Sequence, residues 1–215
     1  MRFVVLYGPP GCGKVMRARE MASALPGPTG EDLTAVAWIQ HGVHGLSVAD
    51  SRVRAPAFRA PHHTVSETGL IGLWERRRSN PHARMFPGEA TLAHAGCLLL
   101  DELPEFRLSA LDALGRALYA GKRTFWHHED PVSIPAAPAL VIATANPCDC
   151  GWADYPGRTC KCGEARVARY LERLHRCLYL VSRERSWEWF RGSPIELTAA
   201  SSSASPSFSP MAGAP

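Results

Sequence analysis

The residues with the clearest chemical potential lie near the start of the chain and have the spacing of a phosphate-binding loop. In order, they are Gly8, Pro9, Pro10, Gly11, Cys12, Gly13 and Lys14. Glycines at this spacing let backbone N–H groups turn toward phosphate oxygens, and the lysine reaches the β- and γ-phosphates of a nucleotide. A glycine-rich turn without a ligand is the alternative. The apolar run before the loop and the helical segment after it favour phosphate binding.

The position after the lysine departs from the phosphate-loop pattern. A serine or threonine normally stands there, and its hydroxyl ligates Mg²⁺. This chain has Val15, whose side chain has no oxygen. We therefore expect the backbone and Lys14 to bind nucleotide, while metal-assisted hydrolysis is weakened.

Polar residues also follow two later apolar runs. Asp101 and Glu102 come directly after Cys97–Leu100, as in a Walker B site. Asp101 would hold Mg²⁺ through water, and Glu102 would act as general base on the attacking water. Asn146 follows Ala139–Thr144 and would hold the same water or the γ-phosphate. The alternatives are a strand that ends in solvated acids and an ordinary Asn-Pro turn.

Four of the seven cysteines form two C-x-C pairs. They are Cys148, Cys150, Cys160 and Cys162. Four thiolates can complete a tetrahedral Zn²⁺ site, which would order a loop that has little core of its own. Four reduced structural cysteines are the alternative, and the spacing favours zinc.

The apolar runs predict the elements that position these motifs. Buried strands are expected at Phe3–Tyr7, Cys97–Leu100 and Ala139–Thr144, and helices at Lys14–Leu25 and Leu108–Leu118. Strands that alternate with helices predict an α/β fold with a mainly parallel sheet. Ligands bind such sheets at the carboxyl ends of the strands, where all three polar motifs are expected.

The remaining segments have weaker patterns. We expect a helix or a strand at Glu31–Gln40, a hairpin with arms Arg123–Trp126 and Val132–Ile134, a helix at Glu164–Arg176 and a strand at Leu178–Val181. Leu197–Pro215 has no charged residue and is rich in Ser, Ala and Pro, so it is expected to be a disordered tail. These patterns predict a core over residues 1–182 and a C-terminal segment over 183–215.

Composition excludes several classes of protein. The 215 residues are 46% hydrophobic and 20% charged, which is typical of a globular chain and not of a disordered one. No apolar stretch approaches the roughly 18 residues of a membrane span, and the apolar start is too short for a signal peptide. We expect a cytoplasmic protein with reduced thiols. The net charge of +4 predicts at most weak, salt-sensitive DNA binding, through basic segments at Arg76–Arg84 and Arg166–Arg176.

Taken together, the motifs resemble the AAA+ module of the magnesium-chelatase-like competence family (ComM/YifB type). The matching stretches, in the order of the family, are Gly8–Lys14, Phe58–Thr64, Pro87–Glu89, Leu92–His94, Leu99–Phe106, Asn146–Cys148 and Arg169–Leu171. The resemblance implies an ATP-binding P-loop AAA+ (ASCE) three-layer sandwich of the helix-2-insert clade, with Arg123–Ile134 as the insert hairpin. It also implies hexameric rings and a link to DNA processing.

The chain departs from this family at several places. Besides Val15, the Leu-Asp-Arg-Ile-Asp segment of the family is replaced by Leu178–Arg183, so the Asp-Arg that would act on a neighbour's nucleotide is absent. The family's N-terminal domain and helical lid are also expected to be missing. Three hypotheses follow: an ATPase, alone or in a ring with a full-length homologue; a non-catalytic module that binds nucleotide or a partner; and a metal-chelatase or MoxR-like chaperone subunit.

Overall fold

The computed structural model describes residues 1–44, 49–75, 84–127, 130–156, 158–183, 185–192 and 208–211. Its centre is a six-stranded sheet in the order β10-β9-β1-β8-β5-β2. The strands are β1 (Arg2–Tyr7), β2 (Phe58–Arg59), β5 (Cys97–Leu100), β8 (Leu140–Ala145), β9 (Glu188–Gly192) and β10 (Phe208–Met211). All neighbours are parallel except β10, which pairs antiparallel with β9. The α/β class and the mainly parallel sheet are therefore confirmed.

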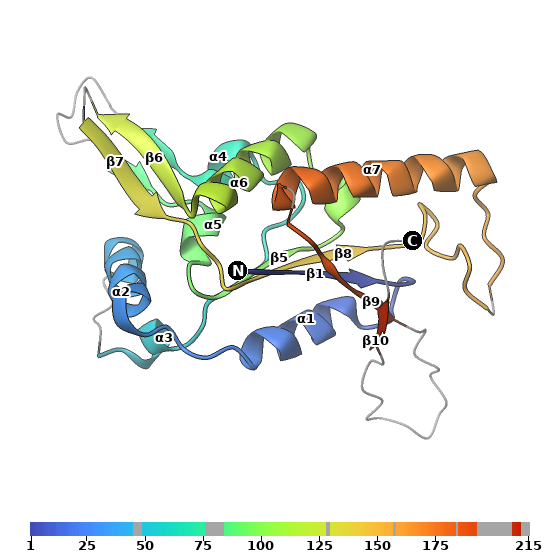
Figure 1. The fold of residues 1–215 in the computed structure, drawn as a ribbon, viewed down its shortest axis with the longest axis horizontal. Helices are drawn as coiled ribbons and strands as arrows, with labels where there is room; N and C mark the ends of the chain where they lie inside the picture. The colour runs from blue at the N-terminus through green and yellow to red at the C-terminus, as the bar shows by residue number, and fades with distance from the viewer. Residues whose placement is uncertain are drawn as a thin grey trace.

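Alternation along β1 explains why helices cover both faces of the sheet. Val4 and Leu6 pack with Ala18 and Ala22 of α1 (Lys14–Ser23) on one face. Phe3, Val5 and Tyr7 belong to a second core cluster with α6 (Leu108–Ala120) and α7 (Glu164–Ser182) on the other face. Figure 1 shows the resulting three layers, with α1 below the sheet and α6 and α7 above it. This is the three-layer P-loop arrangement that the sequence predicts.

Further helices and two hairpins surround one end of the sheet (Figure 1). The helices there are α2 (Gly30–His44), α3 (Ser51–Arg54), α4 (Glu67–Ile71) and α5 (Glu89–Leu92), and a 3₁₀ turn at Leu103–Glu105 precedes α6. Two hairpins are β3 (Leu73–Glu75) with β4 (Arg84–Phe86), and β6 (Lys122–His127) with β7 (Asp130–Pro135). The predicted insert hairpin is therefore present, and α2 settles the helix-or-strand alternative. Most of the first basic segment, 76–83, lies outside the described residues.

Two predictions about the C-terminal part are wrong. Leu178–Val181 continues α7 and is not a strand, because buried Leu174, Cys177, Leu178 and Val181 follow the 3.6-residue period of a helix. The expected disorder of the tail fails for Phe208–Met211, because the backbone of β10 pairs with the otherwise open edge of β9. Residues 193–207 and 212–215 lie outside the described residues. No helix in the part of the chain that the structure describes is long and apolar enough to cross a membrane.

Candidate functional site

The three predicted motifs meet at one edge of the sheet. Tyr7 at the end of β1 pairs with Ala145 of β8, and Leu100 at the end of β5 pairs with Ala143 of β8. Parallel strands in this register bring the residues that follow them to the same edge. The phosphate loop, the acid pair and Asn146 are thereby neighbours, although more than forty residues separate them along the chain.

The phosphate loop joins β1 to α1 and is partly open to solvent. Gly8, Pro9 and Cys12 are buried, Gly13 and Lys14 are half-buried, and Pro10, Gly11 and Val15 are exposed. Gly13 caps the N-terminus of α1 with φ +81°, a left-handed conformation that other residues adopt only with strain. Because α1 follows directly, its first backbone N–H groups lie beside the loop, as an anion site requires.

Lys14 bridges the phosphate loop and the neighbouring strand. Its Nζ donates to Gly8 O at 2.8 Å, to Pro9 O at 2.9 Å and to Asn146 Oδ1 at 2.9 Å. An ammonium group has three hydrogens, so its donors are fully used. Burial lowers the pKa of Lys14, while Cys12, Asp101 and Glu102 act in the opposite direction. Its three oxygen partners are neutral, so a phosphate, which is charged, would be a stronger partner for the same ammonium.

A buried threonine organises the acid pair. Thr144 Oγ1 accepts from the backbone N–H of Glu102 at 2.8 Å and donates its own hydrogen to Asp101 Oδ1 at 2.6 Å. The side chain is fully buried, so this pattern fixes both the Asp101 carboxylate and the strand end that carries Glu102. Sequence reasoning missed Thr144. Its signal was a hydroxyl within an apolar run, two positions before Asn146.

Glu102 is the more accessible of the two acids. Its backbone has φ +55°, and its side chain is 53% exposed, as a group that meets water and substrate must be. His63, from the loop after β2, places Nδ1 3.7 Å from Glu102 Oε2 and stacks on His62 at 4.0 Å between ring centroids. Neither histidine was assigned a role from the sequence, and the structure places His63 beside the predicted general base.

Asn146 is held from two sides. Its side-chain Oδ1 accepts from Lys14, and its backbone N–H donates to Tyr170 Oη at 3.2 Å. Tyr170 lies on α7, and its burial raises the pKa of the phenol, which keeps it neutral. Tyr170 of α7 therefore holds the backbone at Asn146, a contribution that the sequence did not predict, while Lys14 holds its side chain.

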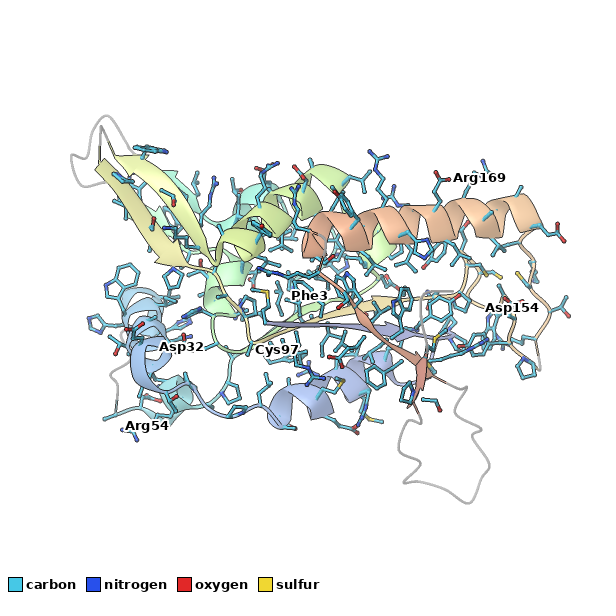
Figure 2. The ribbon with its side chains drawn as sticks, in the orientation of Figure 1. Phe3, Asp32, Arg54, Cys97, Asp154 and Arg169 are labelled. Atoms are coloured by element: carbon cyan, nitrogen blue, oxygen red, sulfur yellow. The ribbon has the colours of Figure 1, made fainter. Side chains whose placement is uncertain are left out.

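The arginines of α7 are partly committed to structural contacts. Arg173 donates to the backbone oxygens of Pro104 and Phe106, and Arg166 pairs with Asp149. Arg169, which is exposed, lies on the outer side of the helix in Figure 2. Arg183, at the C-terminal end of α7, pairs with Asp112 of α6. The basic segment Arg166–Arg176 is therefore not one free basic surface.

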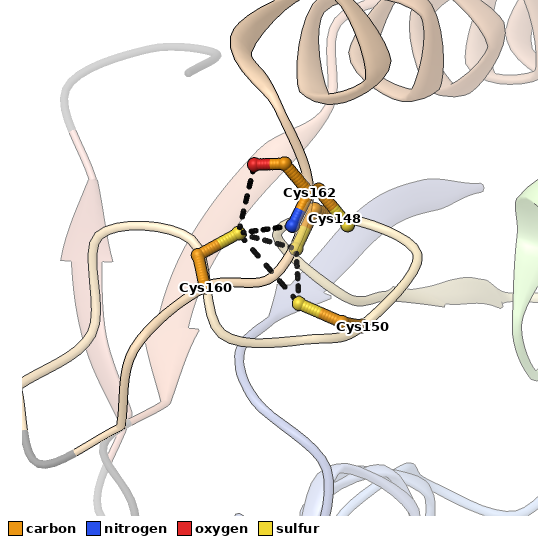
Figure 3. A group of neighbouring side chains, drawn as sticks. All are labelled: Cys148, Cys150, Cys160 and Cys162. Carbon is orange, nitrogen blue, oxygen red and sulfur yellow. Dashed lines mark hydrogen bonds between the residues drawn. The ribbon is translucent and has the colours of Figure 1, made fainter.

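The four predicted cysteines converge on one point (Figure 3). Their sulfur atoms all lie within 4.8 Å of one another, with Cys148 buried and the others half-buried. The Sγ–Sγ distances from Cys148 to Cys150, from Cys150 to Cys160 and from Cys148 to Cys160 are 3.4, 3.6 and 3.7 Å. A tetrahedral site with Zn–S bonds of about 2.3 Å has sulfur–sulfur edges of about 3.8 Å. The donor set and its spacing therefore fit a zinc ion.

Backbone groups favour the thiolate form of Cys150. At Cys160 and Cys162 backbone donors also lower the pKa, but desolvation and the neighbouring cysteines outweigh them and raise it. N–H groups of Lys161 and Trp152 donate to Cys150 and lower its pKa to about 6. Metal ligation requires the thiolate, so such donors favour the metal-binding form of the side chain. The remaining three cysteines, Cys12, Cys97 and Cys177, are buried and lie outside this cluster.

Comparison with known proteins agrees with this geometry. The family model "Magnesium chelatase, subunit ChlI" matches residues 2–182. Curated relatives include an uncharacterized protein of Mycobacterium tuberculosis strain H37Rv, 39% identical over 172 residues, and the uncharacterized protein YifB of Escherichia coli strain K12, 37% identical over 171 residues. The competence protein ComM of Haemophilus influenzae is 34% identical over 171 residues. These matches cover 80% of this chain but 31–32% of the relatives, so the chain spans about a third of their length.

Proposed function

The chain belongs to the magnesium chelatase, subunit ChlI, family, and we propose that it is a cytoplasmic ATP-binding AAA+ module with weak hydrolysis of its own. The observation that carries the proposal is the contact between Lys14 Nζ and Asn146 Oδ1 at 2.9 Å. It joins the phosphate loop to the residue expected to sense the γ-phosphate. A glycine-rich turn without a ligand gives no reason for this juxtaposition.

Each residue of the site has a defined task in this proposal. Lys14 and the backbone N–H groups of the loop bind the β- and γ-phosphates. Asp101, oriented by Thr144, would hold Mg²⁺, which would supply charge neutralisation at the phosphates. Glu102 takes the proton of the attacking water, and Asn146 positions that water or the γ-phosphate.

Hydrolysis is expected to be weak for two reasons. Val15 gives Mg²⁺ no oxygen beside the phosphates, and a lost transition-state contact of roughly 2.7–4 kcal/mol lowers a rate by about 10²–10³. The absent Asp-Arg adds to this, because an arginine supplied by a neighbour is worth about 10³–10⁵ in phosphoryl transfer. The alternative is therefore a non-catalytic module that holds nucleotide or a partner without turnover.

The partners follow from the family. One relative is a competence protein, and this chain spans only part of it, so we propose a role in DNA processing within a ring of copies or with a full-length homologue. The net charge of +4 allows few phosphate contacts, so DNA binding by the chain alone is weak and falls steeply between about 50 and 200 mM salt. A metal-chelatase or MoxR-like chaperone subunit would share the nucleotide site.

The direct test compares the natural chain with Val15→Thr. Affinity for Mg-ADP and steady-state ATP hydrolysis are measured for both, alone and mixed with a full-length homologue. We expect the natural chain to bind ADP with little turnover. Val15→Thr should strengthen the Mg²⁺ dependence of binding and restore hydrolysis only in part. Brisk hydrolysis by the natural chain alone would contradict the weak-ATPase proposal, and failure to bind ADP would contradict the nucleotide site itself.

A second function concerns the cysteine cluster, for which we propose structural Zn²⁺ binding. Cys148, Cys150, Cys160 and Cys162 supply four thiolates at tetrahedral spacing, and the loop between them buries few apolar side chains of its own. Metal analysis of the purified chain should find about one zinc per chain.

A further inference from the structure

The cysteine loop, residues 148–162, is packed directly on the phosphate loop. Gly151, the residue after Cys150, is buried and has φ +84°. A methyl group added at Gly151 would lie 2.6 Å from Pro10 Cγ and nearer still to Pro10 Cδ. Carbon atoms do not approach so closely, so only glycine leaves room for Pro10 at this point. The cysteine loop therefore forms one wall of the phosphate loop.

A second connection runs through the chain itself. Cys148 is fully buried and lies two residues after Asn146, whose Oδ1 accepts from Lys14. The backbone N–H of Gly151 donates to Cys148 O at 2.9 Å, which closes a tight turn between the first two cysteines. Any ligand that fixes Cys148 and Cys150 therefore also fixes Gly151 against Pro10. The same ligand holds Asn146 against Lys14.

The rest of the loop is anchored to the sheet through Arg191. Arg191 of β9 donates to Tyr155 Oη and to Asp154 O, both at 3.1 Å. Figure 2 places Asp154 at the end of the molecule opposite Asp32 of α2. Between Cys150 and Cys160 the buried side chains of the described residues are those of Ala153 and Tyr155, which is little apolar area to hold a loop in shape. A metal ion shared by the four cysteines would supply the remaining order.

We propose that metal binding at the cysteine cluster positions the phosphate loop, so that the affinities for Zn²⁺ and for nucleotide are coupled. This inference rests on the zinc site and the nucleotide site proposed above. Coupling between two sites is reciprocal: the factor by which zinc raises nucleotide affinity equals the factor by which nucleotide raises zinc affinity. Couplings of this kind are typically about 5–150-fold, and we expect about tenfold here.

The contact between the loops is tested with a matched pair of glycine variants. Gly151→Ala places a methyl group against Pro10, whereas Gly30→Ala, at the first residue of α2, also has a positive φ (+56°) but nothing within 4 Å of the added carbon. Zinc content and Mg-ADP affinity are measured on the full chain. Gly151→Ala should keep its zinc and bind ADP about tenfold more weakly, while Gly30→Ala should match the natural chain in both. Natural ADP affinity in a zinc-loaded Gly151→Ala protein would overturn the proposal.

Reciprocity is tested on the natural chain, without substitutions. Zinc is titrated away with a chromogenic chelator in the absence and presence of saturating ADP. The apparent zinc affinity should rise with ADP by the same factor by which zinc removal weakens ADP binding. This titration also decides the case in which Gly151→Ala loses its zinc, because equal zinc affinity with and without ADP would refute the coupling.

The same measurements separate this inference from the two proposals on which it rests, the zinc site and the nucleotide site. A chain that binds ADP but no zinc refutes the metal site, and with it the coupling. A chain that binds zinc but no ADP refutes the nucleotide site. Binding of both without mutual effect refutes the coupling alone.

Discussion

The phosphate loop and the cysteine loop both follow a strand at the same edge of the sheet, but they are ordered in different ways. The phosphate loop is short, and β1 and α1 hold it at both ends through the two core clusters. The cysteine loop is longer. Between Cys150 and Cys160, the buried side chains of the described residues are those of Ala153 and Tyr155. It depends on four side chains that converge on one point. Secondary structure positions the first loop, and we propose that a metal ion bound by the four cysteines positions the second.

This difference predicts that substitutions in the two loops affect nucleotide binding and metal content in different ways. A change in the phosphate loop should remove nucleotide binding and leave the fold and the metal intact. A change in the cysteine cluster should remove the metal and weaken nucleotide binding through the contact with Pro10. Four substitutions test these statements, in order of decreasing effect.

The largest effect is expected for Lys14→Ala. It removes the ammonium group that now donates to three oxygens and that would bind the phosphates. Hydrogen bonds to charged groups contribute about 1.5–3 kcal/mol each, so ADP affinity should fall by at least about 100-fold. Calorimetric titration measures it, with exposed Lys122→Ala of β6 as control. Zinc content should not change, and retained ADP binding would refute the assigned role of Lys14.

Cys160→Ser tests the second loop. A serine hydroxyl is a poor zinc ligand, and even loss of an outer partner lowers metal affinity by about 10–100-fold, so loss of a ligand should exceed this. Zinc per chain, measured by mass spectrometry after dialysis, should fall well below one. Cys177→Ala is the control, because Cys177 is buried outside the cluster. Unchanged zinc in Cys160→Ser would show that the four thiols do not form the site.

Thr144→Val has an intermediate effect, at the end of the sheet that both loops share. The substitution keeps the shape of the side chain but removes the donor to Asp101 and the acceptor for Glu102 N–H. An unsatisfied buried group costs about 1–3 kcal/mol, so the free energy of unfolding in urea should fall by about that amount. Thr124→Val, at an exposed hydroxyl pair with Ser133, should change it by less than about 0.5 kcal/mol. The Mg²⁺ dependence of ADP binding should weaken only in Thr144→Val.

The smallest effect is expected at His94, far from both loops. Burial lowers the pKa of His94 below its ordinary value of 6.5, although Asp32 opposes this. The folded chain therefore prefers the neutral ring, and the unfolded chain takes up the proton first as the pH falls. Stability is complete above about pH 6.5 and declines below it.

His94→Gln should remove this part of the pH dependence. Urea unfolding of the variant and the natural chain at pH 5.5 and 7.5 measures the change. ADP affinity and zinc content at pH 7.5 should match the natural chain, which separates general destabilisation from damage to either loop. An equal decline in stability for both proteins at low pH would show that His94 is not responsible.

Local sequence patterns determined the elements and the loops. Two continuous apolar runs gave the expected buried strands: Cys97–Leu100 became β5 with the predicted bounds, and Phe3–Tyr7 lies within β1. The phosphate loop and the cysteine quartet were also readable, because both depend on residue types at short, fixed spacing. The end of α7 was misread, since a short apolar run such as Leu178–Val181 fits a strand or a buried helical turn equally well.

The tertiary structure decided which loops touch and which side chains orient the site. Lys14 meets Asn146 across 132 positions, Thr144 meets Asp101 across 43, and Gly151 fits against Pro10. Similarly, β10 can pair with β9 because β9 is the edge strand of the parallel part of the sheet. These contacts depend on strand order and on the register between β1, β8 and β5. Strand order and register are properties of the whole packed chain. They depend on which strands lie side by side in the sheet and not on the sequence of one strand alone.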